Sequence, residues 1–209
     1  MAALRLTVLI SGRGSNLQAL IDACAARDFP ATVTLVVSNN PDAEGLARAR
    51  AAGVPTAVVQ LSDHADRDAF DGALSEAIGV HGADLVCLAG FMSILGGPFV
   101  AQWRGRLINI HPSLLPAFPG LDTHARALAA GVREAGCTVH FVTAKVDAGP
   151  VILQEAVPVE QNDTPETLAA RVLSVEHQIY PQAVRLIAEG GPRVVGKTAQ
   201  GATGGERPG

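Results

Sequence analysis

Asn109 and His111 are the side chains of this sequence that are best placed for chemistry. They lie two residues apart at the end of a short apolar run, residues 107–110, which Pro112 stops. Side chains at i and i+2 of a strand share a face, so the amide and the imidazole would lie together at the carboxyl end of a strand, where open α/β sheets bind ligands. An amide donor beside an imidazole suits a reaction that develops negative charge on a carbonyl oxygen. The alternative is an Asn that caps the loop and a His that finds its partners within it.

Asp147 is a third candidate, in the turn Val-Asp-Ala-Gly-Pro at residues 146–150. These residue types are common turn formers, so a plain turn is the simpler interpretation. If the turn folds over His111, however, the carboxylate would favour the protonated imidazole and fix its orientation. No Ser or Cys lies in a nucleophile-elbow context, which favours direct transfer between two bound substrates over an acyl-enzyme.

A glycine-rich loop, Ser-Gly-Arg-Gly-Ser-Asn at residues 11–16, joins an expected strand to an expected helix. Backbone N–H groups at a helix N-terminus, left accessible by small residues, favour phosphate. Gly14, Ser15 and Asn16 are therefore candidates to hold an anion. Leu17 stands where a dinucleotide fingerprint has its third glycine, and the loop lacks the Gly-Lys-Ser/Thr of a P-loop. A tight turn in which Ser15 caps the helix is an equal alternative.

Other candidates are weaker when each is taken alone. The apolar segment at residues 88–95 could line a pocket for a flat ring, although such segments are more often core. Arg67 could meet a carboxylate or be solvated. Glu176 flanks the apolar stripe of the last helix, where it could contact an amine or be exposed. His140 is a candidate to face the site from a strand, and the environment of His124 stays open.

The apolar pattern predicts the elements that would position these residues. Short apolar runs alternate with amphipathic segments through the first half. Residues 111–122, which hold three prolines and a glycine, predict an irregular loop. A helix, two strands and a long helix with Thr164 as N-cap and Pro165 at its first position follow. The expected strands are residues 4–10, 33–37, 55–59, 84–88, 107–110, 137–142 and 151–157; the expected helices are residues 16–26, 42–52, 66–80, 124–130 and one from 165 onward. Such repeats predict an α/β fold, a Rossmann-like open twisted sheet that is mostly parallel with an antiparallel C-terminal edge and helices on both faces.

Composition sets the class of protein. The chain has 209 residues, 48% of them hydrophobic, with a formal net charge of −4. We expect one domain at residues 1–189 and a glycine-rich, disordered tail at 190–209. The charge argues against a nucleic-acid surface, and no apolar run is long enough for a membrane span, so we expect a soluble, cytoplasmic protein. Three cysteines without CxxC spacing suggest buried reduced thiols, and the histidines form no metal-binding motif.

Several stretches together resemble the glycinamide ribonucleotide formyltransferases, folate-dependent enzymes of purine synthesis. They are ISGRGSN at 10–16, LAGFM at 88–92, NIHPSLLP at 109–116, VHFV at 139–142, DAG at 147–149 and EH at 176–177. The resemblance runs from about residue 6 to residue 189. NIHPSLLP is shared by several formyl-folate enzymes, whereas the GSN loop and the single-domain length narrow the match to this family.

The resemblance implies a role for each candidate residue. Gly14, Ser15 and Asn16 would hold the ribonucleotide phosphate, and Glu176 the glycinamide part. Asn109, His111 and Asp147 would be catalytic. Arg67, Met92, Ser93, Ile94, Leu95 and Asn109 would contact the folate. The implied reaction is attack by the glycinamide amine on the formyl carbon of the co-substrate 10-formyltetrahydrofolate, without metal, in a monomer or weak homodimer.

Two positions depart from the family pattern, and three alternatives stay open. Ser93 stands where the family commonly has Arg, and Leu173 replaces a usually polar residue, so peripheral ligand contacts would be weaker. A formyltetrahydrofolate hydrolase resembles this domain but normally carries an N-terminal regulatory domain. A methionyl-tRNA formyltransferase would need a C-terminal domain and a basic RNA surface. A catalytically silent folate or nucleotide sensor is the non-enzyme alternative.

Overall fold

A seven-stranded sheet forms the centre of the computed structural model, which describes residues 2–195 and 198–200. Its strand order is β3-β2-β1-β4-β5-β6-β7. The strands are β1 (Leu4–Ile10), β2 (Ala31–Ser38), β3 (Thr56–Val58), β4 (Leu85–Leu88), β5 (Leu107–His111), β6 (Glu134–Phe141) and β7 (Val151–Pro158). The first five run parallel, and β6 and β7 are antiparallel to their neighbours. The expected fold class, with its antiparallel C-terminal edge, is confirmed.

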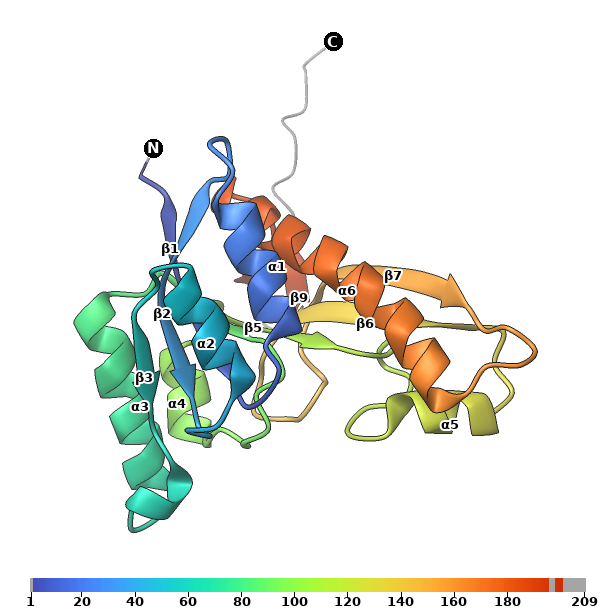
Figure 1. The fold of residues 1–209 in the computed structure, drawn as a ribbon, viewed down its shortest axis with the longest axis horizontal. Coiled ribbons are helices and arrows are strands. Elements are labelled where there is room, and N and C mark those ends of the chain that lie inside the picture. The colour runs from blue at the N-terminus through green and yellow to red at the C-terminus, as the bar shows by residue number, and fades with distance from the viewer. Residues whose placement is uncertain (1, 196–197, 201–209) are drawn as a thin grey trace.

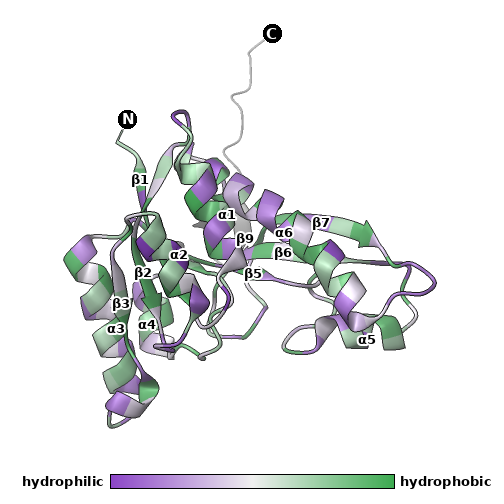
Figure 2. Cartoon of the chain, viewed as in Figure 1, coloured by the Kyte–Doolittle hydropathy of each residue, from purple (hydrophilic) through white to green (hydrophobic). Residues whose placement is uncertain are grey.

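Helices cover both faces of this sheet (Figure 1). They are α1 (Ser15–Cys24), α2 (Glu44–Ala51), α3 (Arg67–His81), α4 (Gly97–Gln102), α5 (Thr123–Ala129) and α6 (Pro165–Ala188), with a 3-10 turn at Leu61–Asp63. Alternation along β1 explains the two layers: Leu6, Val8 and Ile10 pack with α1, α2, α5 and α6, whereas Leu9 packs with α3 and α4. In Figure 2, hydrophilic and hydrophobic residues are mixed along α1, α3 and α6, as expected of helices that bury one face.

The strand order places three loop-bearing strand ends side by side. β1 pairs with β2 on one side and β4 on the other, so the chain changes direction at β1, and β5 follows β4. Ligands of open α/β sheets bind outside the carboxyl ends of the strands at such a switch point. The loops that follow β1, β4 and β5 meet there, and β6 brings residues 138–141 alongside β5 in antiparallel register.

The expected elements differ from the observed ones at a few points. The helix α4 was not expected: Gly96, Gly97 and Pro98 suggest a loop, yet Pro98 is well suited to the first turn of a helix. On α6, Tyr180 and Val184 belong to the buried stripe, whereas Leu186 is 37% exposed. The expected cap of α6 by Thr164 is present as a reciprocal capping box with Thr167.

Residues 196–197 and 201–209 of the predicted tail lie outside the described residues. Within it, β8 (Arg193–Val195) and β9 (Thr198–Gln200) pair as antiparallel strands, which differs from the disorder expected there. Val and Thr are β-branched and favour extended backbone, a local preference that the glycine count hides. The division into residues 1–189 and 190–209 stays a prediction. Among the described residues, no helix has the length and apolar character needed to cross a membrane.

Candidate active site

A cavity of about 690 Å³ opens at the carboxyl ends of β4 and β5. Its volume is within the usual range for small-molecule pockets, and its lining is mostly apolar with a few polar groups. The lining comes from four segments and Val100 of α4: Leu88 and residues 90–95, residues 109–112, residues 120–124, and residues 140 and 142–147 apart from Lys145. The candidates Asn109, His111 and Asp147 therefore share one cavity with the apolar segment that was expected to bind a flat ring.

Four polar side chains converge on one wall of this cavity. Asn109 and His111 come from β5, as their spacing predicted, and the register of β6 places His140 opposite Asn109. Asn109 Nδ2 lies 3.3 Å from His140 Nε2. Asp147 lies between the imidazoles, with Oδ2 3.5 Å from His111 Nδ1 and Oδ1 3.7 Å from His140 Nε2. One carboxylate thus serves two imidazoles.

A strained turn holds Asp147 over His111. Asp147 has φ 51°, a left-handed conformation that is uncommon outside glycine and often marks a functional position. Gly149 brings the turn against β6 so closely that a Cβ there would lie 1.7 Å from the Phe141 carbonyl oxygen. The Gly120 N–H donates to Asp147 Oδ2 at 2.8 Å. The turn therefore folds over His111, which places the Asp147 carboxylate beside the imidazole.

Asp147 is held in its ionised form. Burial by itself would raise the pKa of this carboxyl, but hydrogen bonds from His140 and the Gly120 N–H, together with the charge of His111, lower the pKa below its ordinary value. A buried carboxylate with such partners is a stable negative charge at neutral pH.

Each ring nitrogen of the two imidazoles faces a polar group. His111 Nε2 lies 3.0 Å from the Phe118 carbonyl oxygen, and its Nδ1 faces Asp147. Both partners only accept, so a hydrogen on either nitrogen of His111 has a partner to which it can donate. His140 Nδ1 lies 3.0 Å from the Phe141 carbonyl oxygen, and its Nε2 faces both the Asn109 amide, at 3.3 Å, and Asp147 Oδ1, at 3.7 Å.

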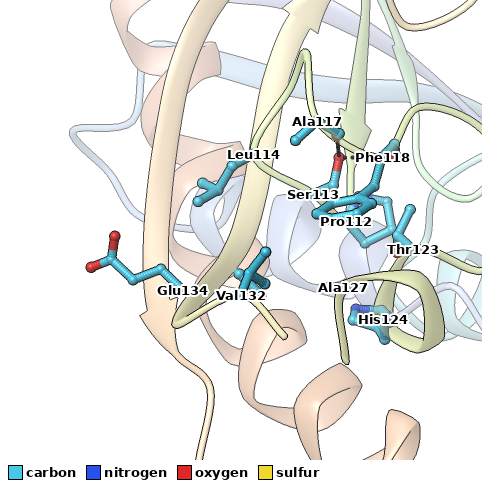
Figure 3. A pocket seen from close by; sticks show the side chains of 11 residues that line it. Pro112, Ser113, Leu114, Ala117, Phe118, Thr123, His124, Ala127, Val132 and Glu134 are labelled. Atoms are coloured by element: carbon cyan, nitrogen blue, oxygen red, sulfur yellow. Dashed lines mark hydrogen bonds between the residues drawn. The ribbon is translucent and has the colours of Figure 1, made fainter. Parts of the chain in front are cut away.

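The loop after β5 is fixed from behind by a polar network (Figure 3). The Ser113 hydroxyl donates to the Ala117 carbonyl at 2.7 Å, and Thr138 Oγ1 donates to the Ser113 carbonyl at 2.6 Å. Figure 3 shows Ser113 and Phe118 on one side of a second cavity, of about 110 Å³, and His124 on the other. His124 lines both cavities, and burial, then the charge of His111, lowers its pKa.

The glycine-rich loop forms the start of α1 as a backbone site. Gly14 is the N-cap residue, with φ 70°, and no described side chain caps the helix. The expectation that Ser15 is the cap is wrong, because Ser15 already lies in the first turn. A Cβ on Gly14 would lie 2.6 Å from Gly45 Cα, so both glycines are needed for this close approach. The first N–H groups of α1 are thus available to an anion.

Asn16 and Glu176 form a buried pair beside that loop. Asn16 Nδ2 donates to Glu176 Oε2 at 2.6 Å, and Glu176 is only 6% exposed, so the alternative that it is simply exposed is wrong. Burial raises the pKa of Glu176, and the bond from Asn16 opposes that rise. Gly14, Ser15, Asn16, Glu176 and Arg67 do not line the large cavity.

Hydrogen bonds join the glycine-rich loop to the apolar segment of the cavity. The Ser11 N–H donates to the Gly90 carbonyl at 3.1 Å, and the Met92 N–H donates to Ser11 Oγ at 2.7 Å. Asn39 Nδ2 donates to Ser93 Oγ at 3.2 Å, and Arg67 donates to the Ile94 carbonyl. Candidates far apart in sequence are thereby brought into one connected region.

Sequence reasoning did not place Ser11 or the Phe118 carbonyl in the site, and it left His140 undecided. Ser11 is the first residue of the glycine-rich loop, but its hydrogen bond to a loop some 80 positions away is one that no local pattern encodes. Phe118 acts through its backbone at φ 51°. The signal for His140 lies in the β5–β6 register, where it is the partner of Asn109. Among the described residues, no group of three or more His, Cys, Asp or Glu could hold a metal ion.

Comparisons with known proteins agree on one family. The family model described as formyl transferase matches residues 4–184. Phosphoribosylglycinamide formyltransferase of Escherichia coli (strain K12) is 50% identical over 187 residues, which cover 90% of this chain and 88% of that protein. The solved structure of glycinamide ribonucleotide transformylase 1 from Symbiobacterium toebii has a TM-score of 0.92 and 51% identity, covering 95% of this chain and 94% of that one.

A longer relative matches through only a part of its length. The trifunctional purine biosynthetic protein adenosine-3 of Bos taurus is 52% identical over 190 residues, which are 91% of this chain but 19% of that protein. This chain therefore corresponds to about a fifth of the bovine protein.

Proposed function

Because the chain belongs to the formyl transferase family, we propose that it is an enzyme that transfers the formyl group of 10-formyltetrahydrofolate to the amine of glycinamide ribonucleotide in purine biosynthesis. The observation that carries the proposal is the cluster in which Asp147 faces His111 and His140, with the Asn109 amide 3.3 Å from His140. Its relative in Escherichia coli, named phosphoribosylglycinamide formyltransferase, matches over nearly its whole length, which supports this choice of substrate.

The cluster would act on the charge that develops during transfer. The amine nitrogen bonds to the formyl carbon as the bond from that carbon to N10 breaks, and a proton passes from the amine to N10. Asn109 and the His111 imidazolium would stabilise the negative oxygen formed on the way, because both offer N–H donors beside an apolar cavity. Asp147 would keep His111 charged and His140 would hold the amide of Asn109 in place.

The two substrates would bind on opposite sides of this cluster. The backbone of Gly14, Ser15 and Asn16 at the start of α1 would hold the ribonucleotide phosphate, and Glu176 would contact the glycinamide part. The folate would lie in the large cavity against Asn109 and the segment Met92, Ser93, Ile94 and Leu95. Arg67 would meet its carboxylate with the guanidinium N–H groups that Ile94 leaves free.

Other parts of the proposal concern the setting. The partners would be these two small molecules and neither nucleic acid nor a membrane, in keeping with the net charge of −4. We place the enzyme in the cytoplasm as a monomer or weak homodimer. Ser93, bonded by Asn39, would give the folate a neutral contact where the family commonly offers Arg.

The experiment is to mix the protein with glycinamide ribonucleotide and 10-formyltetrahydrofolate and to detect formylated ribonucleotide by mass spectrometry. We expect product only when both substrates are present. Release of formate without ribonucleotide would identify a hydrolase instead. Binding of either molecule without turnover would identify a sensor, and both outcomes would overturn the proposal.

A further inference from the structure

We propose that Asp71, on α3, is a positioning residue that sets the conformation of the loop at residues 90–96, which we call the 90–96 loop. Given the proposed function, Asp71 would thereby control the affinity for the folate without touching it. The 90–96 loop contributes residues 90–95 to the lining of the large cavity, and Asp71 is not among the lining residues.

Asp71 reaches the end of this loop from α3, which lies on the same face of the sheet as α4. Its side chain is buried, with 6% exposure, and Oδ2 accepts the Gly96 N–H at 2.7 Å. Gly96 is the N-cap residue of α4, so this one bond fixes the point at which the loop becomes helix. A hydrogen bond from an amide to a carboxylate is among the stronger ones in proteins, especially when it is shielded from water.

A side chain at position 96 would displace the Asp71 carboxylate. A Cβ on Gly96 would lie 2.6 Å from Asp71 Oδ2. The backbone of Gly96, with φ −70° and ψ 159°, is a conformation that every residue adopts easily. Glycine is therefore favoured here by the approach of the carboxylate and not by the backbone.

The carboxylate is costly where it stands. Its second oxygen, Oδ1, is buried and has no hydrogen-bond partner among the described residues. Burial raises the pKa of Asp71, while the Gly96 N–H and the charge of Arg67 lower it. A buried carboxyl with one unpaired oxygen needs an explanation other than packing. Capping the six-residue α4 contributes too little stability to supply that explanation.

Polar contacts help to fix the 90–96 loop because two of its four apolar side chains are exposed, while Phe91 and Leu95 pack partly against the core. Met92 is 71% exposed and Ile94 is 67% exposed, so they contribute little packing that could fix the loop. Ser11 holds it at Met92 and Arg67 holds it at Ile94, both through exposed bonds. Asn39 holds it at Ser93 through a part-buried bond. Because Asp71 is buried and binds the backbone where α4 begins, we infer that it determines the loop's conformation most strongly.

The test measures the Michaelis constant of each substrate separately. Asp71→Ala should raise KM for 10-formyltetrahydrofolate about tenfold, while kcat and KM for glycinamide ribonucleotide change by about twofold or less. Asp71→Asn keeps an acceptor for the Gly96 N–H and should restore most of the affinity. Asp68→Asn is the matched control: it removes the same charge from an exposed position of the same helix and should leave both constants unchanged.

A double-mutant cycle tests the contact itself. Gly96→Ala should raise KM for the folate as Asp71→Ala does, because the new Cβ displaces the carboxylate. In the Asp71→Ala background the same change should add less than about twofold, because the obstacle is gone. Independent, multiplying effects would overturn the proposal.

Hydrogen exchange separates this inference from the proposed function. Amides at residues 92–97 should exchange faster in Asp71→Ala than in the wild type, whether or not the protein catalyses formyl transfer. If the wild type transfers no formyl group but exchange rises as expected, the function fails and the positioning role stands. If exchange is unchanged, or both substrates lose affinity equally, Asp71 does not position the loop.

Discussion

Asp147 is the residue on which the electrostatics of the site converge. Its two oxygens face two imidazoles, and the Gly120 N–H, from the loop after β5, donates to Oδ2. The spacing of Asn109 and His111 predicted that they share one wall. Asp147 could be named from its type, but its place over His111 depends on a positive φ and on the fit of Gly149 against Phe141, which a single sequence does not encode.

Replacing Asp147 by Asn should lower stability in a way that depends on pH. The folded protein lowers the pKa of this carboxyl, so its contribution is present above the ordinary pKa of about 4 and is lost as the pH falls through the lowered value. We expect Asp147→Asn to lower the free energy of unfolding by about 1.5–3 kcal/mol at pH 7 and by much less at pH 3. Urea unfolding at both pH values measures this. Asn tolerates the left-handed backbone, so strain does not confound the comparison, and a loss independent of pH would contradict it.

Replacing Glu176 by Gln should raise the free energy of unfolding at high pH, whereas Asp147→Asn lowers it. Burial raises the pKa of Glu176, so its effect on stability is favourable below the ordinary pKa and is lost as the pH rises through the raised value. Glu176→Gln keeps an acceptor for Asn16 and removes the buried charge. We expect a gain in unfolding free energy on the order of 1 kcal/mol at pH 8 that disappears near pH 4, together with weaker binding of glycinamide ribonucleotide. Thermal unfolding of both proteins at the two pH values measures the stability. If Glu176→Gln and the wild type are equally stable at pH 8, burial of the Glu176 carboxylate does not lower stability.

Elements were more predictable than the loops between them. Buried parallel strands are continuous apolar runs, and Phe70, Leu74 and Ile78 on α3 repeat with helical spacing, so their existence follows from periodicity. The ends shifted by one to three residues because ladder partners, such as Pro158 for Glu134, extend a strand beyond its apolar part. The helix α4 was missed because six residues flanked by glycines carry too little pattern. Side chains that meet across loops, such as Ser11 and Met92, leave no periodic trace.

The start of α1 offers a matched test of close packing between elements. Gly14 and Gly53 have nearly the same backbone, with φ +70° and +71°, but a Cβ on Gly14 would meet Gly45 whereas a Cβ on Gly53 would meet nothing within 4 Å. Gly53→Ala should cost about 1–2 kcal/mol from the left-handed backbone alone. Gly14→Ala should cost about 1–3 kcal/mol more and should weaken ribonucleotide binding. Urea unfolding of both variants gives the difference; equal costs would show that the loop can yield.

At the scale of the whole molecule, one sheet serves two separate cores and one site. The helices on each face bury their own cluster, and the loops at the strand ends remain free to carry polar groups. The net charge of −4 describes the whole chain and does not reveal the local anion site that we propose at the backbone N–H groups of α1. The fold class followed from the order of the elements, whereas the site needed the register that the folded sheet supplies.

The predicted domain boundary can be tested by shortening the chain. The described residues of both hydrophobic clusters, with the partly buried side chains packed against them, end at Ile187. A chain that ends at Glu189 should therefore keep its unfolding free energy within about 0.5 kcal/mol and its rate of formyl transfer. Unfolding and steady-state assays of the shortened and full-length chains measure both. A large loss of either would place residues 190–209 within the functional unit.

The most direct test of the proposed reaction is a single-turnover measurement with His111→Ala and both substrates bound. The rate of formyl transfer should fall about 10²–10⁴-fold, because the imidazolium acts on the charge that develops during transfer, while the dissociation constants of both substrates change little. His81→Ala, an exposed histidine at the end of α3, should behave as the wild type. A His111→Ala rate within tenfold of the wild type would contradict the assignment of the reaction to this cluster.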